Sequence, residues 1–140
     1  TYQIEAGRAV AGDYDIGQIA DWVMAQEIAP LIYSSADPAV VKAAQDAHGP
    51  GVAAAAIEAL FAQLAPAIAA KGVRRLVVAG GETSGAVVTG LGANTLTIGP
   101  RAAAGVPLAR SGDMALALKS GNFGGPDFFA AALNLMETPA

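Results

Sequence analysis

Two segments of the chain share one pattern: an apolar run stops abruptly in a glycine-rich turn, and residues able to form a helix follow. Residues 76–85 read LVVAGGETSG, and residues 115–129 read ALALKSGNFGGPDFF. In an open α/β sheet such turns lie at the carboxyl ends of strands, where helix N-termini present free backbone N–H groups to anions. Two turns of this kind in one small domain predict a phosphate site.

The rest of the chain alternates short apolar runs with stretches of helical periodicity. Asp15 and Asp37 are typical helix starts, a long alanine-rich helix follows the turn at residues 48–51, and the last helix is expected at residues 128–136. This alternation predicts an α/β fold with a mostly parallel sheet and helices on both faces, in three layers. The glycine-rich phosphate-binding turns should then meet at one edge, at the carboxyl ends of their strands.

Three finer expectations concern the second half of the chain. We expect a turn at residues 80–85 before a short helix at residues 86–91, and an edge strand at residues 106–108. In the last helix, the spacing of Phe129, Leu133 and Met136 predicts that these three side chains pack inward.

Composition excludes several classes of function. The 140 residues fit a single domain, and a net charge of −4 with only eight Lys plus Arg and no basic cluster predicts no nucleic-acid partner. No apolar run reaches the roughly 18 to 20 residues of a membrane span, so we expect no membrane partner. The chain has no cysteine, which fits a cytoplasmic protein. Because the chain starts without a methionine and in mid-pattern, we expect a fragment of a longer protein.

The residues of the two turns offer groups suited to an anion. Glycines 80 and 81 let the backbone approach closely, Thr83 and Ser84 carry hydroxyl donors, and Glu82 could hold Mg²⁺ directly or through water. The helix dipole contributes only about 0.3 to 1 kcal/mol, so several donors must converge. The facing wall and its neighbours would come from these residues: Ser34, Lys119, Ser120, Gly121, Asn122, Gly124 and Gly125.

The residues alone also allow simpler interpretations of the two turns, in which they bind no ligand. The turns match neither a Walker A sequence nor a GxGxxG fingerprint, so they could simply be tight connections. Lys119 could be solvated, and Glu82 could cap its own helix. With one histidine, His48, and no GxSxG, a nucleophilic triad is not expected, and the lack of cysteine and further histidine predicts no thiolate or histidine-rich metal centre.

Three runs carry a resemblance to a known family: VVAGGETSGAVV, TIGPRAAAGVPLAR and LALKSGNFGGPDFF. Together they resemble the C-terminal nucleotide-binding domain of the four-carbon acid sugar kinases, which include 3-oxo-tetronate, threonate and erythronate kinases. The resemblance implies ATP-dependent phosphorylation of a four-carbon acid sugar, with ATP held mainly in this half. It implies nucleotide contacts from these residues: Gly81, Glu82, Thr83, Ser84 and Gly124. Supporting backbone would come from Gly80, Gly121, Asn122 and Gly125.

Members of that family also carry an N-terminal domain that binds the acid sugar. The resemblance therefore implies that residues 1–140 are a single nucleotide-binding domain, the C-terminal part of a two-domain kinase that is inactive without its other half. No residue here can be nominated as the general base, and the oligomeric state stays open, a homo-oligomer included. The alternatives are a non-catalytic sensory or binding domain for a phosphorylated metabolite and a purely structural role.

Overall fold

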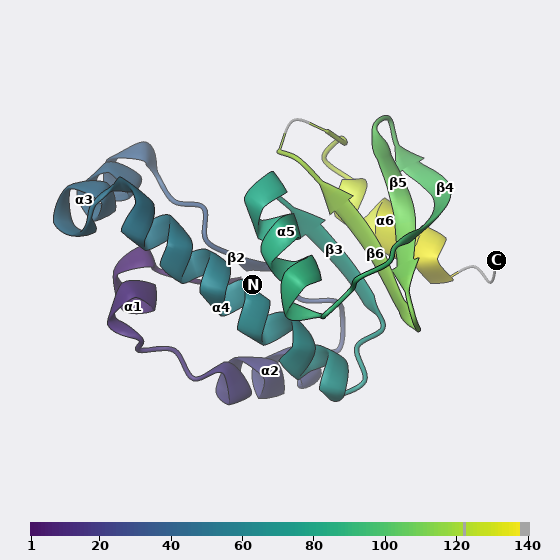
Figure 1. The fold of residues 1–140 in the computed structure, drawn as a ribbon, viewed down its shortest axis with the longest axis horizontal. Helices are drawn as coiled ribbons and strands as arrows, with labels where there is room; N and C mark the ends of the chain where they lie inside the picture. Colours follow the sequence, from purple (N-terminus) through teal and green to yellow (C-terminus); the bar gives the residue numbers. More distant parts are fainter. Residues whose placement is uncertain (122, 138–140) are drawn as a thin grey trace. The chain divides into compact units, whose positions relative to one another are not determined.

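The computed structural model describes residues 1–121 and 123–137, and the chain divides into two compact units, Thr1–Lys71 and Gly72–Ala140. Each unit is described by itself, with the element labels of Figure 1. The first unit contains β1 (Tyr2–Gln3), α1 (Ala6–Ala11), α2 (Ile16–Met24), β2 (Ile32–Tyr33), α3 (Pro38–His48) and α4 (Pro50–Ala70). The second contains β3 (Arg75–Ala79), α5 (Gly81–Gly90), β4 (Thr97–Ala103), β5 (Val106–Ser111), β6 (Met114–Lys119) and α6 (Phe128–Glu137). That all 140 residues act as one nucleotide-binding domain stays a prediction.

Helix α4 is the centre of the first unit, because α1, α2 and α3 all pack on it. Strands β1 and β2 pair in parallel beside these helices. The expected cap of α2 is confirmed, since the Asp15 carboxylate accepts the N–H of Gln18 at 3.0 Å. Asp37 precedes α3 as expected, but its side chain makes no capping hydrogen bond.

Helix α4, with 21 residues and a mean hydropathy of 1.7 over an 18-residue stretch, is the one helix of the described chain long and apolar enough to cross a membrane. The expectation that no apolar run reaches this length was therefore wrong for α4. Its one glutamate, its one glutamine and Pro66 do not interrupt the helix, so the apolar residues on either side of them belong to one continuous segment. Length and composition alone are weak grounds for a span, since the core helix of a globular unit passes the same test. The absence of a membrane partner stays a prediction.

The second unit holds a four-stranded sheet in the order β3-β6-β5-β4. The α/β class is confirmed, but parallel pairing joins only β3 to β6 in this sheet, while β6-β5 and β5-β4 are antiparallel. The reason is the length of two connections: only Ala104 and Gly105 separate β4 from β5, and only Gly112 and Asp113 separate β5 from β6. Two residues close a hairpin, whereas a parallel crossover needs a dozen or more.

The expected edge strand at residues 106–108 was also misplaced. Strand β5 lies between β6 and β4, and the edge is β4. Pro107 is tolerated there because β5 pairs with β6 only from Leu108 onward, so its missing N–H costs no bond of that ladder.

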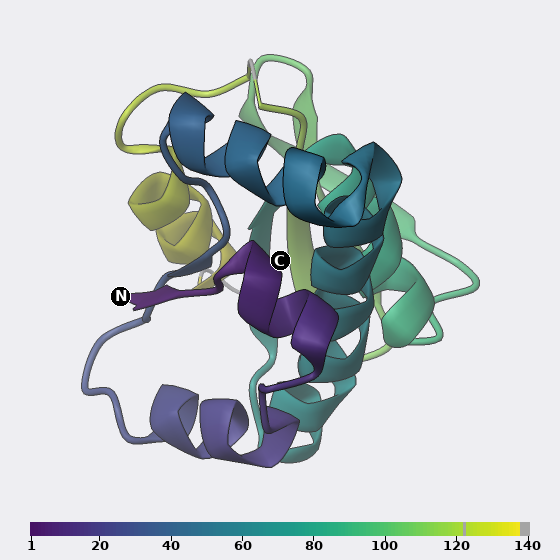
Figure 2. The same ribbon diagram turned by 90° about the vertical axis from the view of Figure 1, so that its left-hand side faces the viewer.

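Helices α5 and α6 cover opposite faces of this sheet, as Figures 1 and 2 both show, which confirms the three layers within this unit. The α6 side is a core of buried apolar residues: Val106, Leu108, Ala117, Phe128 and Ala132. The inward stripe of α6 was expected to include Phe129, but Phe128 is 4% exposed and Phe129 is 36% exposed. Because the stripe runs at a spacing of four from Phe128 through Ala132 to Met136, its neighbour Phe129 turns outward.

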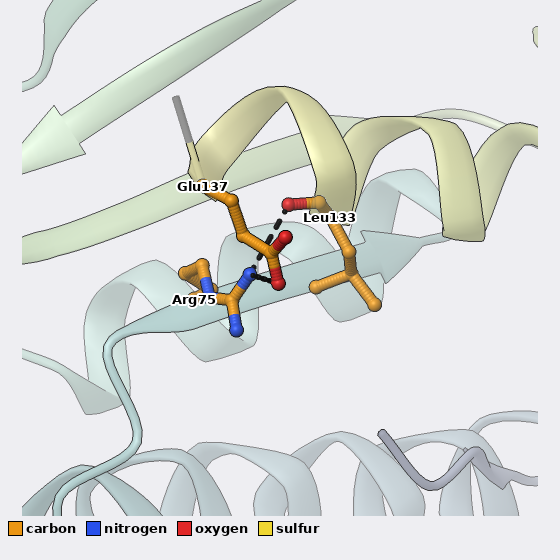
Figure 3. A network of polar contacts seen from close by, with 3 residues as sticks. All are labelled: Arg75, Leu133 and Glu137. Atoms are coloured by element: carbon orange, nitrogen blue, oxygen red, sulfur yellow. Dashed lines mark hydrogen bonds and ion pairs between the residues drawn. The ribbon is translucent and has the colours of Figure 1, made fainter. Parts of the chain in front are cut away.

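The end of α6 is tied to the start of β3 (Figure 3). Nη1 of Arg75 donates to the carbonyl oxygen of Leu133 at 3.3 Å and to a carboxylate oxygen of Glu137 at 2.5 Å. Both charged side chains are 40% or more exposed, so this ion pair adds about 1 kcal/mol or less to stability.

Candidate functional site

The two glycine-rich turns begin side by side at one edge of the sheet. Strands β3 and β6 run parallel with Ala79 opposite Lys119, so both strands end at the same level. The N–H of Gly80 then donates to the carbonyl oxygen of Lys119 at 2.8 Å. The expectation that the turns meet at one edge is confirmed, and a direct hydrogen bond holds their first residues together.

The first turn is shorter than expected, because α5 begins at Gly81 instead of Ala86. Gly80 is the N-cap, and its carbonyl oxygen accepts the N–H of Ser84 at 2.9 Å as the first bond of the helix. The N–H groups of Gly81, Glu82 and Thr83 precede that bond, so the helix itself offers them no acceptor. The predicted binding residues are therefore the first turn of a helix, with three amides at its positive end.

Glycine is required at the first position of this turn and leaves room at the second. Gly80 has φ 107° and ψ 128°, a conformation that a residue with a Cβ rarely adopts. A Cβ at Gly81 would meet no heavy atom within 4 Å. The space beside the first amide of α5 is thus open to a ligand.

The side chains of this turn differ in how accessible they are to a ligand. Thr83 is half-buried and Glu82 is exposed in the first turn, where a carboxylate is favourable to the helix dipole. Ser84 Oγ is shielded from solvent and has no hydrogen-bond partner among the described residues. A ligand would reach that hydroxyl only if the surrounding chain moved, so the backbone amides are the accessible donors.

The second turn is shaped by Gly124 and the ring of Phe128. Gly124 has φ 84°, and a Cβ there would lie 2.7 Å from Cδ2 of Phe128. The N–H of Phe128 donates to the carbonyl oxygen of Gly125 at 3.1 Å, and Nζ of Lys119 donates to the carbonyl oxygens of Ser120 and Gly121 at 3.3 Å each. Lys119 is thus bonded to the first two residues of the second turn through its side chain, and to Gly80, the N-cap of α5, through its backbone carbonyl.

Two predicted residues fall outside this arrangement. Asn122 lies outside the described residues. Ser34 directly follows β2 in the first unit and is described with that unit alone. Among the described residues no cluster of three His, Cys, Asp or Glu side chains could hold a metal ion.

Two features of the site were missed in the sequence. The start of α5 at Gly81 had a signal, since glycine is accepted at the N-cap and an acidic residue such as Glu82 is common in the first turn. The contact of Phe123 with the β4-β5 hairpin had none: a Cβ at Gly105 would lie 3.0 Å from Cε1 of that ring. This contact joins the second turn to the β4-β5 hairpin.

Known proteins share both the sequence and the fold of this chain. The family model described as a nucleotide-binding C-terminal domain matches residues 1–129. A 3-oxo-tetronate kinase of Methylobacterium radiotolerans is 57% identical over 76% of this chain and 26% of its own length. The 3-oxo-tetronate kinase of Haemophilus influenzae is 41% identical over 94% of this chain and 33% of its own length.

Two solved structures share this fold. A crystal structure of a Haemophilus influenzae protein matches with a TM-score of 0.87 and 40% identity, over 96% of this chain and 34% of that protein. A Salmonella typhimurium protein matches with a TM-score of 0.82 and 36% identity, over 94% of this chain and 34% of that protein. The chain thus spans about a quarter to a third of the length of its relatives. By the family match over most of its residues, this chain belongs to the nucleotide-binding C-terminal domain family.

Proposed function

We propose that this chain is the ATP-binding part of a kinase that phosphorylates a four-carbon acid sugar of the 3-oxo-tetronate, threonate or erythronate type. The single observation that carries the proposal is the junction of the two turns, where Gly80, directly before the free amides of Gly81, Glu82 and Thr83, donates to the carbonyl oxygen of Lys119, directly before the second turn. The names of the relatives support the kinase class.

The chemistry of phosphoryl transfer is compatible with an enzyme that binds ATP in one part and the acid sugar in another. The reaction depends chiefly on positioning and on stabilising charge that is spread over phosphate oxygens. In this chain the amides at the start of α5 would bind those oxygens, Thr83 would add a hydroxyl, and the open space at Gly81 would admit the phosphate. Mg²⁺ bound with the nucleotide would neutralise phosphate charge, and Glu82 is the carboxylate in the first turn of α5 that would face it through water.

Selection of the acid sugar would lie elsewhere in the longer protein. The matched relatives are about three times as long as this chain, and no residue here is assigned as a general base. We therefore expect the isolated chain to bind nucleotide without phosphorylating a sugar. A coupled assay of ADP release by the full-length enzyme, run against four-carbon acids and their 3-oxo forms, would identify the acceptor.

Binding is tested by titration calorimetry of this chain with ATP or ADP and Mg²⁺. Gly81→Val should abolish the heat of binding by filling the phosphate space, while Gly85→Val is the matched control. Both glycines lie in α5 and neither has a heavy atom within 4 Å of an added Cβ, but Gly85 lies one turn further from the amides. Equal losses in the two variants, or no heat from a folded wild-type chain, would contradict the proposal.

A different result would support a sensory domain instead. If sugar phosphates bound this chain more tightly than adenine nucleotides, the same amides would serve a phosphorylated metabolite. An unchanged melting temperature across a panel of nucleotides and phosphates would indicate a structural role, because a ligand that binds only the folded state raises its stability.

A further inference from the structure

The four-stranded sheet of the second unit has two edges, and they are built differently. Strand β4 forms one edge and carries Gly99, Pro100 and Arg101. Its pairing with β5 shifts register on both sides of Arg101, and all residues from Thr97 to Arg101 are exposed. Proline, charge and bulges are the usual means by which an edge strand avoids pairing with further strands. Strand β4 is therefore protected as a true edge of the sheet.

Strand β3 forms the other edge and is not protected in this way (Figure 1). Its sequence is RLVVA, and it pairs with β6 over all five residues without a shift in register. Its one charged side chain, Arg75, lies at the first position and bonds to Leu133 and Glu137 of α6. Three apolar residues follow in succession, and both α5 and α6 pack on β3. A continuous apolar run covered by helices on both faces is typical of a strand inside a parallel sheet.

Part of the backbone of β3 points to the open edge. The carbonyl oxygen of Arg74 and the N–H of Gly80 both bond to β6. Because the N–H and C=O groups of successive residues point to alternate sides of a strand, the even-numbered residues between these two also face β6. The odd-numbered residues face the other way: Arg75, Val77 and Ala79. Among the described residues β6 is the only strand that pairs with β3, so these backbone groups have no strand to bond.

We propose that β3 is an interior strand of the complete protein, and that its open edge pairs with a β-strand from outside these 140 residues. Sufficient chain exists for this, because the matched relatives are about three times as long. Since helices flank both faces of β3, the partner strand should be apolar on both of its faces as well. An unpaired apolar edge would otherwise be a site of aggregation. A second copy of this chain is the alternative occupant.

Amide hydrogen exchange in the full-length protein tests whether this edge is paired. We expect the N–H of Val77 to exchange within about tenfold of the N–H groups of Leu76 and Val78, because a paired amide exchanges only when the strand opens locally. In the folded 140-residue chain, which lacks the partner strand, the N–H of Val77 should exchange at least about a hundredfold faster than these two neighbours. Leu76 and Val78 are the matched controls, since they belong to the same strand and face β6.

Two results would overturn the inference. One is exchange of Val77 in the full-length protein at least about a hundredfold faster than that of its neighbours. The other is a 140-residue chain that light scattering shows to be a dimer with the Val77 amide protected, because the edge would then pair with a second copy.

The full-length protein decides alone if the 140-residue chain does not fold. Protection of Val77 in the monomer would support the inference, and protection found only in a dimer would overturn it. None of these measurements involves a nucleotide. The inference shares with the proposed function only the premise that this chain is part of a longer protein, so either can fail while the other stands.

Discussion

Replacing Gly124 by alanine perturbs the second turn at the point where the structure leaves no room for a side chain. The residue has φ 84°, and an added Cβ would lie 2.7 Å from Cδ2, 2.8 Å from Cγ and 3.0 Å from Cβ of Phe128. Real Cβ atoms essentially never approach other atoms as closely as the first two of these distances, so either the ring or the turn must shift. Because Phe128 belongs to the core under α6, a shift of the ring disturbs packing as well.

The cost can be worked from these two effects. A left-handed conformation costs a residue other than glycine about 1–2 kcal/mol. Forcing an extra carbon into a packed core costs a further 1–3 kcal/mol, roughly. We therefore expect Gly124→Ala to lower the free energy of unfolding by about 2–5 kcal/mol, a large part of the roughly 5–15 kcal/mol typical of a domain.

The assay is urea denaturation followed by far-UV circular dichroism, with Gly85→Ala as the control. Gly85 lies inside α5 and has no heavy atom within 4 Å of an added Cβ. Alanine at this position should therefore raise the free energy of unfolding by about 0.5–1 kcal/mol. Fluorescence of Trp22, the only tryptophan, reports the first unit separately. A Gly124→Ala midpoint equal to that of the wild type would refute the packing argument.

Three further changes test other parts of the structure. Asp15→Ala removes the carboxylate that accepts the N–H of Gln18 and should lower the unfolding free energy by about 1 kcal/mol, measured as a Trp22 fluorescence midpoint; no change would contradict the cap. Arg75→Ala removes an exposed ion pair with Glu137 and a 3.3 Å hydrogen bond to the carbonyl oxygen of Leu133, and should cost about 1 kcal/mol in a urea titration, so a loss of several kcal/mol would show that these contacts were underestimated. Gly105→Ala, at φ 76° and with 3.0 Å to the Phe123 ring, should lower the melting temperature by several degrees, whereas wild-type melting would mean that the hairpin tolerates a side chain there.

The part of the fold that sequence could predict is the part set by local pattern. The runs before Gly80 and after Met114 became neighbouring strands with adjacent turns, because parallel strands joined through helices end at the same edge. The cap at Asp15 followed from a side chain and an amide three residues apart. Such features depend on neighbours in the sequence.

The features that could not be predicted from the sequence depend on contacts between residues far apart in the chain, or on segments whose local sequence suits two different conformations. The β4-β5 and β5-β6 hairpins lie in a stretch with weak strand alternation, and the sheet is mixed because β6 pairs in parallel with β3 and antiparallel with β5. The sequence of residues 81–85 is compatible with a loop or with a helix. In the structure the N–H of Ser84 donates to the carbonyl oxygen of Gly80, which is the first hydrogen bond of a helix. Phe128 and Phe129 are neighbouring residues of the same type, so the sequence does not tell which one is buried. The side of α6 that faces the sheet determines that it is Phe128.

The central claim is that the start of α5 and the Gly124 turn together bind a nucleotide. The most direct test is amide NMR of the labelled chain during a titration with ADP and Mg²⁺. The account predicts saturable shifts that are largest at the N–H groups of Gly81, Glu82, Thr83 and Gly124. Saturable shifts that leave the first turn of α5 unaffected, or no shifts at all in the folded chain, would contradict it.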